Sequence, residues 1–229
     1  PAYEATILET IRDIYKAGHV YKAKKPVYWS VGCETALAEA EVEYQDHTSH
    51  SIYVPFQVKG KPDQFVVIWT TTPWTLPANL AIAVHELYQY VEVHSGSKTY
   101  IVAKDLAQNF IETCKLENIH LGIEKTGKDL EGLCCLHPFL PRESKVILSE
   151  FVTLDTGTGC VHTAPGHGQE DYIVGLRYGL DVLSPVDEKG RFTKEAGVFE
   201  GEYVFEANEK IIGLLKEKNA LLQTGTLVH

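Results

Sequence analysis

The sequence has no methionine, and it has no apolar run near the length that crosses a membrane. A spanning helix needs about 20 consecutive apolar residues, and a secretory signal needs a basic stretch followed by an apolar one. Neither layout occurs in the 229 residues, which open on Pro1. We therefore expect a cytosolic protein without a membrane partner, and the missing start residue suggests a piece of a longer polypeptide.

Positively charged residues are few: the sequence has 21 Lys and Arg against 31 Asp and Glu, which gives a formal net charge of -10. Nonspecific nucleic-acid binding needs clustered cations that neutralise phosphates, so this balance argues against it. A pocket that grips one nucleotide remains compatible. The five cysteines lack the two-residue spacing of a zinc knuckle, and we expect reduced thiols.

The composition, 44% hydrophobic and 23% charged, is that of a globular domain with a real core. Ile7, Ile11 and Ile14 repeat at helical spacing and predict a helix over 3–17. Similar patterns predict further helices over 106–114, 169–178 and 205–218.

Short apolar stretches between these helices predict strands over 52–58, 65–69, 80–84, 88–93 and 99–103. Ser95-Gly96-Ser97 separates the last two and predicts a hairpin turn. Many short strands with frequent glycine and proline favour a β-rich α+β fold, with a closed or nearly closed β-barrel core and peripheral helices.

The first informative segment follows an apolar strand, and we call it the threonine loop. Its prolines cannot donate to a strand ladder, so the strand must end there. Hydroxyls on a stiff loop can bind a ribose or a carbonyl, and indole rings can stack on a base. The alternative is an ordinary loop whose threonines are strand formers. The loop comprises Trp69-Thr70-Thr71-Thr72-Pro73-Trp74-Thr75-Leu76-Pro77-Ala78-Asn79.

The second informative segment, residues 155–171, is rich in glycine, which allows positive φ and close backbone approach. Asp171 ends it in the first turn of the predicted helix, where a carboxylate can instead serve only as a cap. His162 is compatible with a structural or a catalytic role. His162 and His167 have no carboxylate at ligand spacing, so no metal is expected, and no nucleophile elbow occurs.

Together these two segments resemble the two signatures of the editing domain shared by isoleucyl-, valyl- and leucyl-tRNA synthetases. The run from His162 to Gly168 is most similar to the isoleucyl members. Relatives typically carry an arginine at the position of Thr72 and an acidic residue at that of Trp74. Further similarity lies in residues 25–29 and 36–44.

The resemblance implies a junction helix in 1–25, the editing domain in 26–204, and a second junction helix in 205–229 that leads back to a synthetic core. Some members bind zinc through a cysteine pair at the entry. Here Ser30 occupies the first position and only Cys33 remains. We therefore expect neither a metal nor a cofactor.

The implied function is post-transfer editing, the hydrolysis of the ester bond of valyl-tRNA(Ile). Isoleucyl-tRNA synthetases are the standard example of the need for it, because one methylene changes binding by only roughly 1–3 kcal/mol. A second pocket that fits valine and overlaps sterically with isoleucine restores discrimination. The expected partners are the tRNA 3′ end, its valine moiety and the remainder of the synthetase chain.

The resemblance also implies roles for single residues. His162 would bound the side-chain pocket or meet the ribose hydroxyl, Asp171 would pair with the α-ammonium group, and Asn79 would support them. The catalytic residues, acting on a bound water without a covalent intermediate, would be Thr71, Thr72, His162 and Asp171. The terminal adenosine and the ester would be surrounded by Trp69, Thr70, Thr71, Thr72 and Thr75.

Three other interpretations stay open at the level of sequence. The chain could be a non-catalytic insert that binds the tRNA end or supports a synthetase, which the intact threonine loop and Asp171 argue against. It could be a free-standing hydrolase of misacylated tRNA, which the junction-like helices argue against. It could also be a β-rich domain without activity, which the joint occurrence of both segments argues against.

Overall fold

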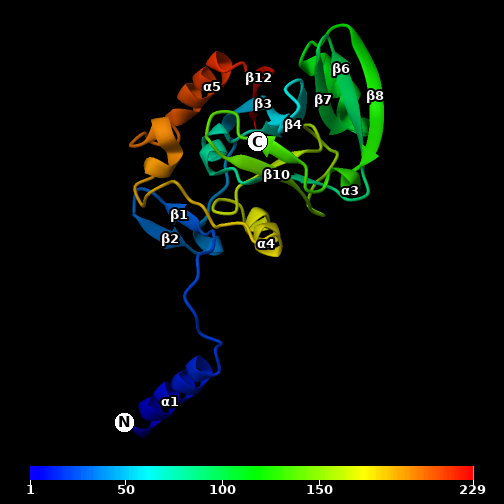
Figure 1. Ribbon diagram of the computed structural model, residues 1–229. Helices are drawn as coiled ribbons and strands as arrows, with labels where there is room; N and C mark the ends of the chain where they lie inside the picture. Colours follow the sequence, from blue (N-terminus) through cyan, green and yellow to red (C-terminus); the bar gives the residue numbers. More distant parts are fainter. Residues whose placement is uncertain (229) are drawn as a thin grey trace.

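The computed structural model describes residues 1–228, and its body is one mixed ten-stranded sheet with helices around it (Figure 1). A separate two-stranded hairpin is formed by β1 (Tyr28–Ser30) and β2 (Thr35–Leu37). The large sheet contains β3 (Thr48–Val58), β4 (Gln64–Thr70), β5 (Ala81–Val84), β6 (Gln89–Ser95), β7 (Lys98–Ala103), β8 (Ile119–Thr126), β9 (Cys134–Leu136), β10 (Glu143–Leu148), β11 (Val161–Thr163) and β12 (Gln223–Val228).

Five α-helices and four 3-10 turns complete the described chain. The α-helices are α1 (Ala2–Lys16), α2 (Ala107–Thr113), α3 (Gly127–Leu130), α4 (Gln169–Arg177) and α5 (Ala207–Glu217). The 3-10 turns are η1 (Glu39–Glu41), η2 (Pro73–Ala78), η3 (Lys104–Leu106) and η4 (Lys194–Phe199). The predicted helices and strands are thereby confirmed within a few residues at their ends. The sequence analysis predicted neither α3 nor the strands β1, β2, β8, β9, β10, β11 and β12.

The sheet runs in the order β11-β5-β10-β9-β3-β4-β7-β6-β8, and β12 pairs with the first half of β3. The pairs β5·β10 and β4·β7 are parallel, and the other pairs are antiparallel. All four residues of β5 are buried, because β5 lies between β11 and β10 in the sheet. This central position explains why its sequence is a continuous apolar run rather than an alternating one.

The expectation of a closed or nearly closed barrel is wrong, because the sheet is open. It curls enough to bring β11 close to β4, but within residues 1–228 its outermost strands, β11 and β8, pair with no common neighbour. β11 is only three residues long and is soon followed by Pro165, which has no N–H to continue a ladder.

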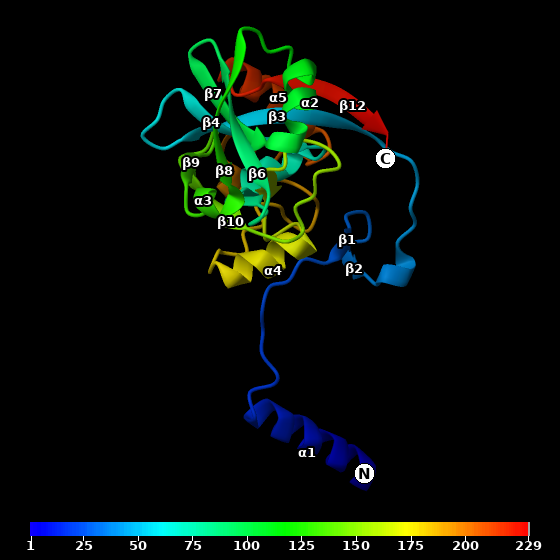
Figure 2. The ribbon, with the colours of Figure 1, turned by 90° about the vertical axis from the view of Figure 1, so that its right-hand side faces the viewer.

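The two terminal helices have similar sequence patterns but different surroundings. α5 buries Ala207, Ile211, Ile212 and Leu215 in the main core. α1 buries none of its residues, and it stands apart from the body at the end of an extended segment (Figure 2). The segment predicted over 205–229 reaches His229, which lies outside the described residues. No helix within residues 1–228 is long and apolar enough to span a membrane.

Candidate functional site

The threonine loop leaves the sheet at Thr70 and returns to it at β5 through the 3-10 turn η2. The Thr70 hydroxyl accepts a hydrogen bond from the Thr72 N–H at 3.1 Å, which turns the chain out of β4. Pro73 then occupies the first position of η2, where a missing N–H costs nothing. The Thr75 hydroxyl donates to the Thr72 carbonyl at 2.8 Å and closes the turn.

The structure brings the threonine loop and the glycine-rich segment together. β5 and β11 pair antiparallel, and the Leu80 N–H donates to the Thr163 carbonyl at 3.0 Å. The Trp69 ring packs on Gly157, which has φ +80°, and a Cβ added there would lie 3.1 Å from the ring. Both the positive φ and this contact require glycine.

His162 sits between Asn79 and Thr75 in a directional chain of hydrogen bonds. The Asn79 Nδ2 donates to the Ala81 carbonyl and to His162 Nδ1, both at 2.8 Å. A carbonyl can only accept, so this contact fixes the orientation of the amide. His162 Nδ1 is therefore the acceptor, and Nε2 carries the proton and donates to the Thr75 hydroxyl at 3.0 Å.

His162 is neutral in this environment. Burial, with smaller contributions from the neighbouring His137 and His167, lowers the pKa of His162 to about 3. Both ring nitrogens are already used within the protein, so a ribose hydroxyl could bind the ring only by displacing Asn79 or Thr75. The geometry therefore supports a wall or positioning role, and direct contact with substrate stays a prediction.

Asp171 lies just beyond the end of β11, in the first turn of α4. Its Oδ2 accepts a hydrogen bond from the Ala164 N–H at 2.8 Å, outside the helix, and its carboxylate packs on Gly168. Burial raises the pKa of Asp171, and the Ala164 hydrogen bond opposes this shift. Within residues 1–228 its other oxygen has no hydrogen-bond partner, so Asp171 can still receive a cation.

Thr71 and Thr72 are half-buried, and neither hydroxyl is hydrogen-bonded to another residue of the described chain. Both line an open groove of about 910 Å³ between the loop, the segment before β3 and the start of α5. Trp74 also lines this groove, and its backbone N–H donates to Asn208 Oδ1 at 3.0 Å. Its indole ring packs edge-to-face against His167 and Phe205. The groove is therefore lined both by the threonine hydroxyls and by a packed aromatic ring.

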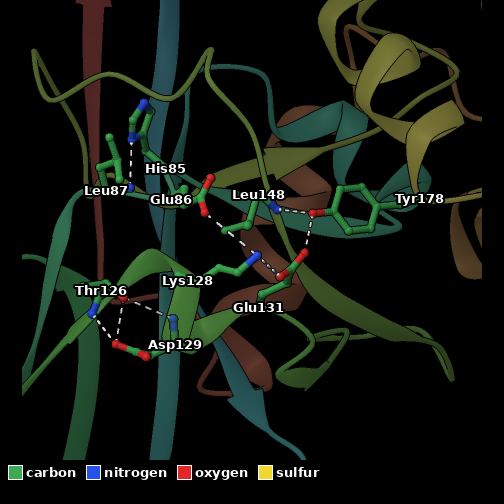
Figure 3. Close-up of polar contacts among 9 residues, drawn as sticks. All are labelled: His85, Glu86, Leu87, Thr126, Lys128, Asp129, Glu131, Leu148 and Tyr178. Atoms are coloured by element: carbon green, nitrogen blue, oxygen red, sulfur yellow. Dashed lines mark hydrogen bonds and ion pairs between the residues drawn. The ribbon is translucent and has the colours of Figure 1, made fainter.

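Another hollow, of about 540 Å³, lies at the opposite ends of β5 and β10. None of the predicted site residues lines it. Figure 3 shows the polar contacts beside it, where the Tyr178 hydroxyl accepts from the Leu148 N–H at 3.0 Å and donates to Glu131 at 2.7 Å. Lys128 also pairs with Glu131, at 3.0 Å. These contacts join α4, α3 and β10, and they indicate a structural role for this region.

The sequence analysis missed three polar residues that contact the threonine loop from the connection between β9 and β10. These are His137, Arg142 and Ser144. No local pattern marks them, since their partners lie 61 to 65 residues earlier in the chain.

Residues 1–133 match the family model described as "tRNA synthetases class I (I, L, M and V)". The match covers more than half of the chain and includes the whole threonine loop. The chain belongs to this family. The resemblance inferred from the two segments is thereby confirmed.

Among curated proteins, the chain is similar to isoleucine--tRNA ligases over its whole length. It is 52% identical to that of Petrotoga mobilis over 229 residues, 52% to that of Desulforamulus reducens over 235, and 50% to that of Thermotoga maritima over 231. In each case it spans 25% of the relative's length. The chain thus corresponds to about a quarter of these relatives.

Among solved structures, the chain resembles one described as "The crystal structure of GlLeuRS-CP1", with a TM-score of 0.60. The likeness covers 75% of this chain and 97% of that chain, at 16% identity. At this identity the likeness concerns the fold alone. It supports the α+β fold type expected from the resemblance, with the open sheet as the correction.

Proposed function

We propose that this chain hydrolyses the ester bond of valyl-tRNA(Ile) in post-transfer editing, as part of an isoleucine--tRNA ligase. The observation that carries the proposal is the pair of hydroxyls of Thr71 and Thr72, which have no hydrogen-bond partner within residues 1–228, on a loop whose Thr70, Thr75 and Asn79 side chains are hydrogen-bonded within the protein. The isoleucine--tRNA ligases that match the chain over its whole length support the choice of amino acid.

In this proposal the groove beside Thr71 and Thr72 receives the terminal adenosine and the valyl ester. Their hydroxyls donate hydrogen bonds to the ester oxygen on which negative charge develops. Water adds to the carbonyl carbon, the bond to the ribose oxygen breaks, and that oxygen takes up a proton. Valine leaves as the free acid, and no bond to the protein forms.

Asp171 anchors the α-ammonium group of the valyl moiety through its unpartnered oxygen. An ionised carboxylate and an ammonium group form a charge-assisted hydrogen bond, which is stronger than one between neutral groups. Asp171 lies in the first turn of α4 and does not line the groove itself, so in this proposal the valyl moiety extends beyond the groove, contacting Thr72 at one end and Asp171 at the other. Such two-point binding aligns the carbonyl for attack.

We also propose that residues 1–25 and 205–229 are junctions with the remainder of a synthetase chain, around an editing domain over 26–204. The exposed apolar face of α1 supports this for the first junction. Ile7, Leu8, Ile11 and Ile14 are 43%, 66%, 52% and 43% exposed, which is a typical feature of a helix that packs against further protein.

The test is to incubate the chain at high concentration with valyl-tRNA(Ile) and, separately, with isoleucyl-tRNA(Ile), and to follow release of each amino acid. Selective release of valine is the expected result. Release of neither amino acid, from samples that bind tRNA, would contradict hydrolysis and favour a non-catalytic insert that binds the tRNA end.

A further inference from the structure

The hairpin of β9 and β10 holds the backbone of the threonine loop with two side chains. His137 Nε2 donates to the Leu76 carbonyl at 2.9 Å. The Arg142 guanidinium donates to the Pro77 carbonyl at 2.9 Å and to the Asn79 carbonyl at 3.3 Å. One short hairpin thus binds three carbonyls within four residues of the loop.

The direction of the His137 contact is fixed by its other nitrogen. His137 Nδ1 accepts hydrogen bonds from the Phe139 and Leu140 N–H groups at 3.3 and 3.1 Å, so the proton lies on Nε2. His137 is only 5% exposed, and burial lowers its pKa to about 4. A buried donor that lost its acceptor would destabilise the fold, so hairpin and loop hold one another in place.

Ser144, the second residue of β10, adds a side-chain contact. Its hydroxyl, fully buried, donates to Asn79 Oδ1. This contact turns the Asn79 amide so that Nδ2 faces His162 Nδ1. The relay therefore runs from Ser144 through Asn79 and His162 to Thr75 and the Thr72 carbonyl.

We infer that His137, Arg142 and Ser144 form a clamp that positions the threonine loop for the proposed hydrolysis. The clamp fixes the carbonyls of residues 76–79 and the tautomer of His162, and it thereby holds the Thr72 backbone at the edge of the groove. The three are positioning residues, since none of them lines the groove. The inference deepens the proposed function and rests on it for its catalytic part.

Ser149 is a matched control for Ser144. It directly follows the far end of β10 and is also buried, at 8% exposure. Its side chain makes no hydrogen bond to the threonine loop, and it lines the hollow at the far end of β5 and β10. Ser149→Ala therefore removes a buried serine hydroxyl from the other end of β10 without changing the relay.

The first test measures the His162 tautomer by 15N NMR of imidazole-labelled protein, and it needs no substrate. Wild type and Ser149→Ala should show the proton on Nε2. Asn79→Asp should move it to Nδ1, because a carboxylate there can only accept, and Ser144→Ala should give a mixture of tautomers. An unchanged Nε2-protonated signal in both Asn79→Asp and Ser144→Ala would overturn the relay, whether or not the wild type hydrolyses valyl-tRNA(Ile).

The second test measures hydrolysis of valyl-tRNA(Ile). Ser144→Ala should lower kcat by about 10- to 100-fold with KM within about twofold, since misplacement by about 1 Å costs this much without removing a substrate contact. Arg142→Lys should act in the same direction, because one ammonium nitrogen cannot take the places of the two guanidinium nitrogens that reach the Pro77 and Asn79 carbonyls. It serves as the second variant if Ser144→Ala fails to fold.

Two outcomes of the second test separate the clamp from the proposed function. A wild-type kcat in both Ser144→Ala and Arg142→Lys, with both proteins folded, would overturn the clamp and leave the proposed hydrolysis intact. A wild-type chain that released no valine would overturn the proposed function, and the NMR result would still decide on the clamp.

Discussion

The two halves of the threonine loop differ in how their polar groups are used. In the first half, the hydroxyls of Thr71 and Thr72 lie in an open groove and have no hydrogen-bond partner within residues 1–228. In the second half, Thr75 and Asn79 are tied to His162 by hydrogen bonds of 3.0 and 2.8 Å. We call these the free half and the fixed half.

The difference shows how a loop can be both reactive and precise. Hydroxyls that must be ordered on binding cost conformational entropy, which weakens the affinity for the substrate. They therefore bind well only if the loop already holds them in the binding geometry. The fixed half provides this order, and it does so with buried hydrogen bonds rather than apolar packing alone. Changes in the fixed half should therefore affect stability, and changes in the free half should affect selectivity.

The largest effect expected is a loss of stability in acid. Burial lowers the pKa values of His162, His137 and His167 to about 3, 4 and 4, below the value of about 6.5 in an unfolded chain. The unfolded state therefore binds more protons below pH 6.5, and stability present above that pH is lost as the pH falls. Between pH 7 and pH 5 each histidine should contribute a loss of about 2 kcal/mol.

Urea unfolding at pH 7, 6 and 5 measures this loss. His137→Gln should flatten the pH dependence by about a third, since it removes one of the three histidines whose pKa is lowered in the fold. Equal pH dependence in His137→Gln and wild type would show that this ring is not held neutral by the fold.

Asn79→Ala should remove about 2–4 kcal/mol from the free energy of unfolding, because it leaves the buried Ser144 hydroxyl and His162 Nδ1 without their partner. Thr71→Ala is the matched change in the free half and should stay within about 0.5 kcal/mol of wild type. Urea midpoints of the two variants check this, and equal midpoints would remove the distinction between the halves.

The sequence predicted the two segments that meet at the candidate site, but neither the distant partners of the fixed half nor the open sheet. Prolines and threonines in residues 69–79 and glycines in residues 155–171 marked both segments, because these residue types restrict the backbone locally. The partners of the fixed half come from far along the chain, and a buried Ser144 carries no local signal. Nor can alternation of apolar residues tell whether the edges of a sheet meet, which is why the open sheet was not predicted.

Asp171→Ala should lower kcat/KM for valyl-tRNA(Ile) by about 30- to 150-fold, the equivalent of a lost hydrogen bond to a charged group of about 2–3 kcal/mol. Glu170→Ala, an exposed neighbour in the same helical turn, is the control and should retain wild-type kinetics. Because burial raises the pKa of Asp171, KM should rise as the pH falls through a value above that of an ordinary aspartate. A wild-type rate in Asp171→Ala would exclude the ammonium anchor.

The most direct test of the account is the ratio of valyl- to isoleucyl-tRNA(Ile) hydrolysis by Thr72→Ala under single-turnover conditions, with urea unfolding of the same sample. We expect Thr72→Ala to hydrolyse valyl-tRNA(Ile) more slowly, because it loses one hydrogen-bond donor to the ester oxygen. We also expect the ratio to fall by about 10-fold, the smaller end of what one methylene is worth, because the shorter side chain leaves room for the extra methylene of isoleucine. The unfolding midpoint should stay that of wild type. A Thr72→Ala protein that keeps the wild-type ratio and remains inert toward isoleucyl-tRNA(Ile) would contradict the account.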